Sequence, residues 1–211
     1  MGFDRGDAAR FLGDLVPVPS AHAHETANLA ALVRHAAPGA ALPPDAELRT
    51  EWHFGPGERE EGERTWDAWG LDAQTVALFL GARAEKRLDP SWFLQLGERV
   101  ARRGRKAVLV GGPAERRLLD GLTLPAGVSL APPLPLRRFA AAIANARAVV
   151  SADTGPMHLS VAVGTPTLQL FSHTESWRFG YAHLPGHALL ETPGRHASVD
   201  EAEDALTRLL A

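Results

Sequence analysis

The sequence predicts an α/β fold, a Rossmann-like parallel sheet with helices on both faces, preceded by a partial N-terminal segment. From residue 74 onward, short apolar runs alternate with segments of helical periodicity. Because β-α-β crossovers are right-handed, this alternation builds a parallel sheet covered by helices on both sides. The helical segments also begin and end at residues typical of helix caps. We therefore expect two parts, residues 1–73 and a Rossmann-like domain over residues 74–211.

The composition of the 211 residues narrows the function classes. The formal net charge of −3 gives no basic field, so no nucleic-acid partner is expected. The chain has no cysteine, which excludes disulfides, thiolate metal sites and thiol catalysis and fits a reducing, cytoplasmic compartment. No apolar run approaches the ~18 residues of a membrane-spanning helix, and the charged N-terminus MGFDRGDAAR differs from a signal peptide.

Residues 1–73 lack an obvious set of strands for a sheet of their own, so this part is expected to expose apolar surface and to self-associate. Its helices follow from apolar spacing and from glycine and proline stops. The prolines of VPVPS allow only an edge strand or coil. The expected elements are a helix over residues 7–15, an extended stretch over 16–20, helices over 25–35 and 58–69, and a linker over 38–63.

The capping chemistry is clearest in the second part. Asp89 and Pro90 open a helix as N-cap and first helical residue, and Gly104 ends it after two arginines that suit the helix dipole. Ser198 and Glu201 form a capping box ahead of an amphipathic C-terminal helix. The strands expected here cover residues 76–81, 107–112, 128–130, 148–150 and 167–171, and the other helices cover residues 90–103, 114–119, 136–145 and 156–163.

The stretch SADTGPMHLSVAVGTPTLQLF, residues 151–171, joins a strand to a helix through an acid, a hydroxyl, a glycine and a proline. In a parallel sheet, ligands collect at the carboxyl ends of the strands. Pro156 presets the first helical turn and Gly155 leaves its backbone open, so the free N–H groups favour an anion, phosphates above all. The helix dipole supplies only about 0.3–1 kcal/mol, whereas millimolar affinity needs about 4 kcal/mol.

Further groups for a phosphate are expected from two other strand ends. The loop GARAEKR carries Arg83 and Lys86, and one lysine plus the helix N-terminus is enough for a diphosphate. The turn VGGPAER offers Gly111, Gly112 and Glu115, whose carboxylate is suited to ribose hydroxyls. The convergence of three strand ends on one crevice is the basis of a nucleoside-diphosphate hypothesis.

Simpler interpretations stay open for these residues. Asp153 is equally suited to capping its helix, His158 to packing, and the basic residues to solvated positions. His22 and His24 have the spacing of a metal pair, but the sequence nearby offers few further ligands. Asp-Thr-Gly also matches aspartic proteases, whose sites lie in all-β folds, whereas a proline and a helix follow here. The chain has no D-x-D triplet to hold a metal against a diphosphate, so no metal is expected. No cofactor is expected either, because a bound nucleotide sugar would be a substrate.

The run VVSADTGPMHLSVAVGTPTLQLF resembles the signature of glycosyltransferase family 9, the lipopolysaccharide heptosyltransferases and their relatives. The segments FLGARAEKRLDPSWFLQLGERV, AVLVGGPAE, LPLRRFAAAIANARAVV and HAHETANLAALV resemble other parts of that family, so the likeness extends over nearly the whole chain. It implies the GT-B architecture, in which two Rossmann-like domains face a cleft, and an inverting, metal-independent transfer.

The resemblance also implies roles for individual residues. Lys86 would contact the diphosphate, Glu115 would face the ribose and Asp153 would hold sugar hydroxyls of a donor such as ADP-heptose. The second substrate would be a glycan or lipid-linked acceptor, reached by peripheral association with the inner face of the membrane. The remaining donor-binding residues would be Arg83, Gly111, Gly112, Thr154, Gly155, Pro156, Met157 and His158.

The sequence departs from the family pattern in three places. Ser172 stands where the family usually has glycine, and Ser160 and Val161 replace the usual Ala-Ala. The start MGFDRGDAARFLGDLV looks like the end of an acceptor domain, so residues 1–73 are expected to be a remnant of that domain and a connector. The catalytic base is then expected in the missing N-terminal part. The alternatives are a non-catalytic nucleotide-sugar or partner-binding remnant and a GT-B sugar-nucleotide epimerase.

Overall fold

The computed structural model describes residues 2–3, 12–17 and 23–211 of the chain. By its contacts the chain divides into two compact units, residues 1–50 with 175–180 and residues 51–174 with 181–211. The division by contacts therefore falls after Thr50, and residues 51–73 pack within the second unit. The assignment of residues 1–73 to an acceptor-domain remnant stays a prediction.

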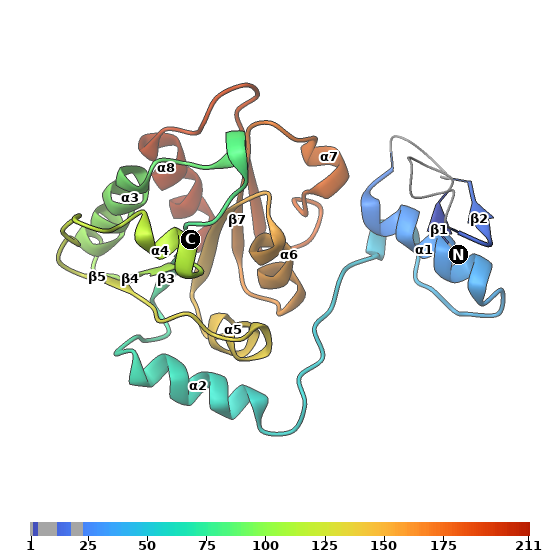
Figure 1. The fold of residues 1–211 in the computed structure, drawn as a ribbon, viewed down its shortest axis with the longest axis horizontal. Coiled ribbons are helices and arrows are strands. Elements are labelled where there is room, and N and C mark those ends of the chain that lie inside the picture. Colours follow the sequence, from blue (N-terminus) through green and yellow to red (C-terminus); the bar gives the residue numbers. More distant parts are fainter. Residues whose placement is uncertain (1, 4–11, 18–22) are drawn as a thin grey trace. The chain divides into compact units, whose positions relative to one another are not determined.

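The second unit is built on a six-stranded parallel sheet in the order β5-β4-β3-β6-β7-β8 (Figure 1). Counted from the first strand of this sheet, the order is the 3-2-1-4-5-6 of the doubly wound Rossmann fold. The expected Rossmann-like parallel sheet is confirmed. Its strands are β3 (Val76–Phe79), β4 (Ala107–Val110), β5 (Val128–Leu130), β6 (Ala148–Ala152), β7 (Thr167–Phe171) and β8 (His187–Glu191).

Helices cover both faces of this sheet. Successive side chains of a strand point to opposite faces, so neighbouring strand residues pack against different helices. In β3, Val76 and Leu78 belong to the apolar cluster under α3 (Pro90–Arg102) and α8 (Val199–Leu210). Ala77 between them belongs to the cluster on the other face, with Trp66 of α2. Because both faces are buried, the strands read as continuous apolar runs rather than alternating ones. The other helices of this unit are α2 (Glu58–Ala68), α4 (Pro113–Arg117), α5 (Leu136–Ile143), α6 (Gly155–Ala162) and the short η3 (Ala84–Lys86).

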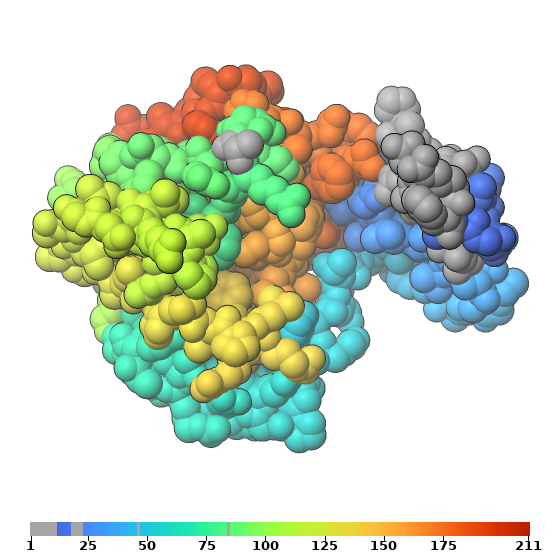
Figure 2. Space-filling model, viewed as in Figure 1, coloured from blue at the N-terminus to red at the C-terminus, as the bar shows by residue number. Residues whose placement is uncertain are grey.

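The helix α2 packs directly against α5, and the two lie side by side on the surface (Figure 2). A Cβ on Gly62 would lie only 2.3 Å from the carbonyl oxygen of Ala141, so the close approach requires glycine. Arg137 also binds Glu58 through two hydrogen bonds of 2.6 Å, and these with the Gly55 N–H lower the pKa of Glu58 to about 2. The expected linker over 38–63 is therefore wrong at its end, where residues 58–63 are helical.

The predicted caps of the second unit are confirmed. The Asp89 carboxylate accepts the Ser91 N–H at the start of α3, and Gly104 follows that helix with a φ of 78°. Ser198 and Glu201 bond each other's backbone in a capping box ahead of α8. The sequence therefore fixes the limits of these helices locally.

The first unit holds α1 (Glu25–Ala36), as expected, together with η2 (Asp45–Glu47) and α7 (Ser176–Phe179). The strands β1 (Gly2–Phe3) and β2 (Leu15–Val16) pair in parallel. The helix expected over 7–15 is wrong where the structure describes it, because residues 12–14 are not helical and Leu15 begins β2; its residues 7–11 lie outside the described part. Leu29 and Val33 of α1 are about half exposed, which fits the expected self-association without testing it.

Candidate functional site

The strand order changes direction at the centre of the sheet, between β3 and β6. Strands β3 and β6 are neighbours, but from β3 the chain continues to β4 and β5, and from β6 to β7 and β8. The connections after β3 and β6 therefore diverge, and in parallel sheets ligands bind outside the carboxyl ends of the strands at such a point. Lys86 lies in the connection after β3, and Asp153 directly follows β6.

The structure brings Lys86 and Asp153 together at this point. Lys86 Nζ lies 2.7 Å from Asp153 Oδ2 and 3.4 Å from the Asp153 carbonyl oxygen. The carboxylate side chain is 8% exposed and the lysine side chain 22% exposed, so the pair is largely shielded but open on one side. An ammonium group has three donors, and Lys86 uses two of them on Asp153, so one remains for a second anion.

Asp153 does not cap the helix that follows it. The N-cap of α6 is Thr154, whose extended backbone has a φ of −149° and whose side chain makes no capping bond. Instead, Asp153 Oδ2 also accepts a hydrogen bond of 2.6 Å from the Thr174 hydroxyl. The capping interpretation of Asp153 is therefore wrong, and this carboxylate is held by side chains from two other strand ends.

The first turn of α6 is open to approach. A Cβ built on Gly155 meets no atom within 4 Å, and its φ is not in the left-handed region. The fold itself therefore does not require glycine at this position. Thr154 turns its hydroxyl back to the Ala152 carbonyl, while Pro156 has no N–H to satisfy. An exposed helix start with these features is suited to a phosphate group.

His158 lies in the same turn and faces the carboxylate. Its Nε2 is 3.7 Å from Asp153 Oδ1. Burial lowers the pKa of His158 below its ordinary value of 6.5; the Asp153 charge opposes this shift and the Lys86 charge adds to it. The imidazole is therefore neutral above pH 6.5, with one donor nitrogen and one acceptor nitrogen.

Glu115 packs over the carboxyl ends of β3 and β4. A Cβ on Gly111 would lie 2.8 Å from the Glu115 Cβ, and one on Gly112 would lie 2.9 Å from Glu115 Oε2. A Cβ on Gly81, just after β3, would lie 3.4 Å from the Glu115 Cγ. Both glycines of VGGPAER thus make room for this acidic side chain at the same edge of the sheet.

Two predicted residues stand apart from this group. The Met157 side chain is fully buried, so only its backbone can take part in a site. Arg83 is exposed in the loop that carries Lys86. Their assigned roles in donor binding stay predictions.

Sequence reasoning missed Thr174 and Tyr181, which contact Asp153 and His158 respectively. Both follow β7, whose residues TLQLF were recognised as a strand. The position after a strand end was therefore the signal available for Thr174. Nothing in the local sequence marks Tyr181, because its contact with His158 depends on the return of the chain after α7.

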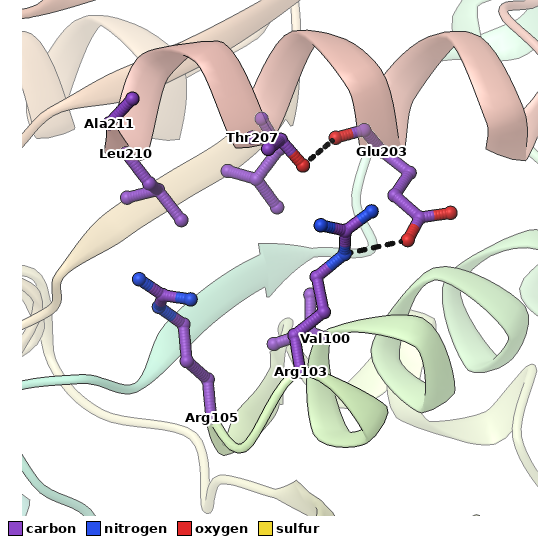
Figure 3. Close-up of a pocket in the computed structure, with 8 residues that line it drawn as sticks. Val100, Arg103, Arg105, Glu203, Thr207, Leu210 and Ala211 are labelled. Atoms are coloured by element: carbon purple, nitrogen blue, oxygen red, sulfur yellow. Dashed lines mark hydrogen bonds and ion pairs between the residues drawn. The ribbon is translucent and has the colours of Figure 1, made fainter.

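A pocket of about 200 Å³ lies at the opposite, amino edge of the sheet, between the ends of α3 and α8 (Figure 3). Val100, Leu206 and Leu210 form its apolar lining. Arg103 donates a 2.8 Å hydrogen bond to Glu203 at its rim. This pocket contains none of the residues predicted to bind a donor, and strand ends of this kind are not where parallel sheets bind ligands.

The comparison with known families decides the affiliation. Residues 17–197 match the sequence profile of glycosyltransferase family 9 (heptosyltransferase). The chain therefore belongs to glycosyltransferase family 9. The lipopolysaccharide heptosyltransferase 1 of Pseudomonas aeruginosa is 39% identical over 92 residues, which cover 42% of this chain and 26% of that protein.

Solved structures of family 9 proteins share the fold. The glycosyl transferase family 9 protein of Veillonella parvula matches with a TM-score of 0.74 and 19% identity over 96% of this chain and 64% of its own. The E. coli heptosyltransferase WaaC with ADP matches with a TM-score of 0.68 and 21% identity over 96% of this chain and 61% of its own. The chain thus spans less than two thirds of the length of these relatives.

The residues that the structure describes hold no group of three or more His, Asp or Glu side chains placed to bind a metal ion. Nor do the described helices include one that is long and apolar enough to span a membrane.

Proposed function

We propose that this family 9 chain binds a nucleoside-diphosphate sugar, of the ADP-heptose type, at the carboxyl edge of its sheet. In the proposal, the chain serves as the donor-binding part of an inverting, metal-independent glycosyltransferase. The acceptor is a lipopolysaccharide or another glycan. The observation that carries the proposal is the pairing of Lys86 with Asp153 at the switch point, beside the open start of α6.

The charges of the site suit a diphosphate that leaves with an extra negative charge. Lys86 supplies a cation, and the first turn of α6 adds backbone donors and a favourable dipole. Groups fixed around a developing charge stabilise it without reorganisation. Because Lys86 is already anchored by Asp153 at 2.7 Å, it is positioned before the substrate arrives.

The sugar and the ribose have separate candidate partners. Lys86 and Thr174 bind the other oxygen of Asp153, and Oδ1 lies 3.7 Å from His158, so we assign Oδ1 to a sugar hydroxyl. Glu115 lies beside Gly111 and Gly112 at the neighbouring strand end, and we assign the ribose hydroxyls to it because acidic residues hold them in dinucleotide-binding folds. The E. coli heptosyltransferase WaaC, which shares the fold, has been solved with ADP, and this makes adenine the base of first choice.

The general base for the acceptor hydroxyl is not assigned to these residues. Asp153 Oδ2 is already bound by Lys86 and Thr174, and a base must be free to reach the hydroxyl it deprotonates. We therefore assign to this chain the binding of the donor and the stabilisation of the leaving diphosphate. The alternative of a non-catalytic binding protein shares the donor site and differs only in the chemical step.

The test is isothermal titration of the folded protein with ADP-heptose, GDP-mannose and UDP-N-acetylglucosamine. We expect ADP-heptose to bind and the other two to bind more weakly. The products are then analysed after incubation with a glycan acceptor. Sugar transfer would establish the enzyme, binding without transfer would support the non-catalytic alternative, and an epimerised UDP-sugar would support the epimerase. No binding of any nucleotide sugar would overturn the proposal.

A further inference from the structure

The His158 ring is contacted on both of its nitrogen atoms. Nδ1 lies 2.9 Å from the Tyr181 hydroxyl, and Nε2 lies 3.7 Å from Asp153 Oδ1. The Tyr181 ring meets the imidazole edge-on, with 5.5 Å between the ring centroids. The orientation of the imidazole plane is therefore fixed by Tyr181, through its hydroxyl and its ring.

Tyr181 is itself held by the sheet. It is 3% exposed, and its backbone N–H donates a 2.8 Å hydrogen bond to the Gln169 side chain. Gln169 belongs to β7 and is fully buried. The chain's single tyrosine thus connects the interior of the sheet to the first turn of α6.

The surroundings of the ring select one tautomer. A neutral imidazole has one N–H and one lone pair in its plane. With the hydrogen on Nδ1, the lone pair of Nε2 would face the Asp153 carboxylate, which is repulsive. With the hydrogen on Nε2, that N–H points toward Asp153 and Nδ1 accepts the Tyr181 hydroxyl hydrogen. Lys86 is the further charge that acts on this ring, and together with burial it opposes a second proton.

The distance between His158 Nε2 and Asp153 Oδ1 leaves these two atoms without a direct hydrogen bond to each other. A distance of 3.7 Å is longer than a direct hydrogen bond. A hydroxyl group can accept from one partner and donate to the other. Because Asp153 Oδ2 is already bound by Lys86 and Thr174, Oδ1 is the oxygen left to receive such a donor.

We infer that Tyr181 is a positioning residue that fixes the Nε2–H tautomer of His158, so that His158 Nε2 and Asp153 Oδ1 form a donor–acceptor pair for one sugar hydroxyl of the substrate. This inference rests on the proposed function for the identity of its ligand. The tautomer itself is a property of the protein alone. Tyr181 acts through His158 and need not touch the substrate.

The first experiment is nitrogen-15 NMR of labelled histidine side chains above pH 6.5, in the absence of nucleotide. His158→Gln assigns the signal. We expect His158 to be the neutral Nε2–H form in the wild type and a mixture of tautomers in Tyr181→Phe, which keeps the buried ring and removes only the hydroxyl. Thr174→Val, which removes a hydroxyl from Asp153 rather than from His158, should retain the wild-type signal.

A wild-type ring in the Nδ1–H form or in the charged form would overturn the inference. So would an unchanged signal in Tyr181→Phe, provided that thermal melting shows the variant to be folded. The NMR experiment tests the tautomer of His158 even if the proposed function is wrong, because it is done without a ligand.

The second experiment compares ADP with ADP-heptose by titration calorimetry. We expect Tyr181→Phe to bind ADP like the wild type and ADP-heptose about three- to tenfold more weakly, the range of one hydrogen bond. Unchanged affinity for ADP-heptose, or an equal loss for both ligands, would overturn the hydroxyl role. Failure of the wild type to bind either ligand would overturn the proposed function and the hydroxyl role together, leaving the tautomer to the NMR result.

Discussion

The strands of the parallel sheet all begin at one side, the amino edge, and all end at the other, the carboxyl edge. These two edges differ in the side chains that gather at them. At the carboxyl edge, Lys86, Thr174 and His158 surround a carboxylate that is 8% exposed. At the amino edge, an apolar pocket of about 200 Å³ is bordered by a partly exposed ion pair between Arg103 and Glu203. The apolar pocket thus lies away from the carboxylate, lysine and histidine that meet at the carboxyl edge. The proposed donor site therefore rests on polar side chains that meet where strands end, and not on the shape of a pocket.

The largest effect is expected for Lys86→Ala at the carboxyl edge. Loss of one charge-assisted hydrogen bond should weaken ADP binding about 10- to 100-fold, while adenosine, which has no phosphate, should bind as before. Lys106→Ala is the matched control, because Lys106 binds the Gly70 carbonyl oxygen and Asp72 away from this site. Titration calorimetry measures all four affinities. An equal loss for ADP and adenosine would remove the phosphate role of Lys86.

The next largest effect is expected at the same edge, where the substitution Gly111→Ala tests the packing of Glu115. Gly111→Ala should lower the free energy of unfolding by about 1–3 kcal/mol, because its Cβ would lie 2.8 Å from the Glu115 Cβ. Denaturant unfolding monitored by circular dichroism measures this loss. A variant as stable as the wild type would show that Glu115 can move away freely, and that its position over the strand ends is not fixed.

Gly155→Ala should behave in the opposite way. Its Cβ meets no atom within 4 Å, so stability should be unchanged or rise by up to about 1 kcal/mol, as expected for Gly→Ala in a helix. ADP affinity should nevertheless fall about three- to tenfold, because the methyl group occupies the approach to the helix N-terminus. Unchanged affinity in a stable variant would contradict a phosphate position at this turn.

At the amino edge, Arg103→Ala should have a small effect. Arg103 is 48% exposed, and Glu203 keeps its second partner Arg99 at 2.8 Å. The free energy of unfolding should fall by less than about 1 kcal/mol, and ADP affinity should not change. A clear loss of ADP affinity would move the nucleotide site to this pocket.

The smallest effect is a difference in pH dependence between the edges. The pKa of His158 is lowered from 6.5, chiefly by burial, so the unfolded chain binds more protons just below pH 6.5 and stability falls as the pH drops through that range. The pKa of Glu203 is lowered from 4.5, chiefly by its bond with Arg99, so its contribution is present above pH 4.5 and is lost below.

Denaturant unfolding at several pH values can separate the two. We expect His158→Gln to flatten the stability profile between pH 6.5 and 4.5, and Glu203→Gln to change it only below 4.5. If His158→Gln changed the profile only below pH 4.5, and Glu203→Gln changed it between pH 6.5 and 4.5, the carboxyl edge would not hold a neutral histidine.

The sequence was sufficient for five of the six strands of the sheet and for the meeting of Lys86 with Asp153. Apolar runs and caps such as Asp89 are local signals, and the crossover rule then brings the carboxyl ends of β3 and β6 to one edge. The strand β8 was missed, because its residues HALLE are only partly buried and it pairs on one side alone, with β7. Edge strands carry a weaker apolar signal than central ones.

The contacts that hold Asp153 could not be derived in the same way. Thr174 and Tyr181 lie on either side of α7, a helix of four residues without a side-chain cap. After this helix, Tyr181 contacts His158, which lies 23 positions earlier in the chain. No periodicity encodes such a return, so the polar partners of a predicted site residue had to come from the structure.

The most direct test of the nucleotide site is chemical-shift mapping of the backbone amides during titration with ADP. We expect perturbations at Lys86, Asp153 and Gly155 at the carboxyl edge, with Arg103 and Leu206 unaffected. Perturbations confined to the pocket between α3 and α8 would place the nucleotide there and overturn the proposed site.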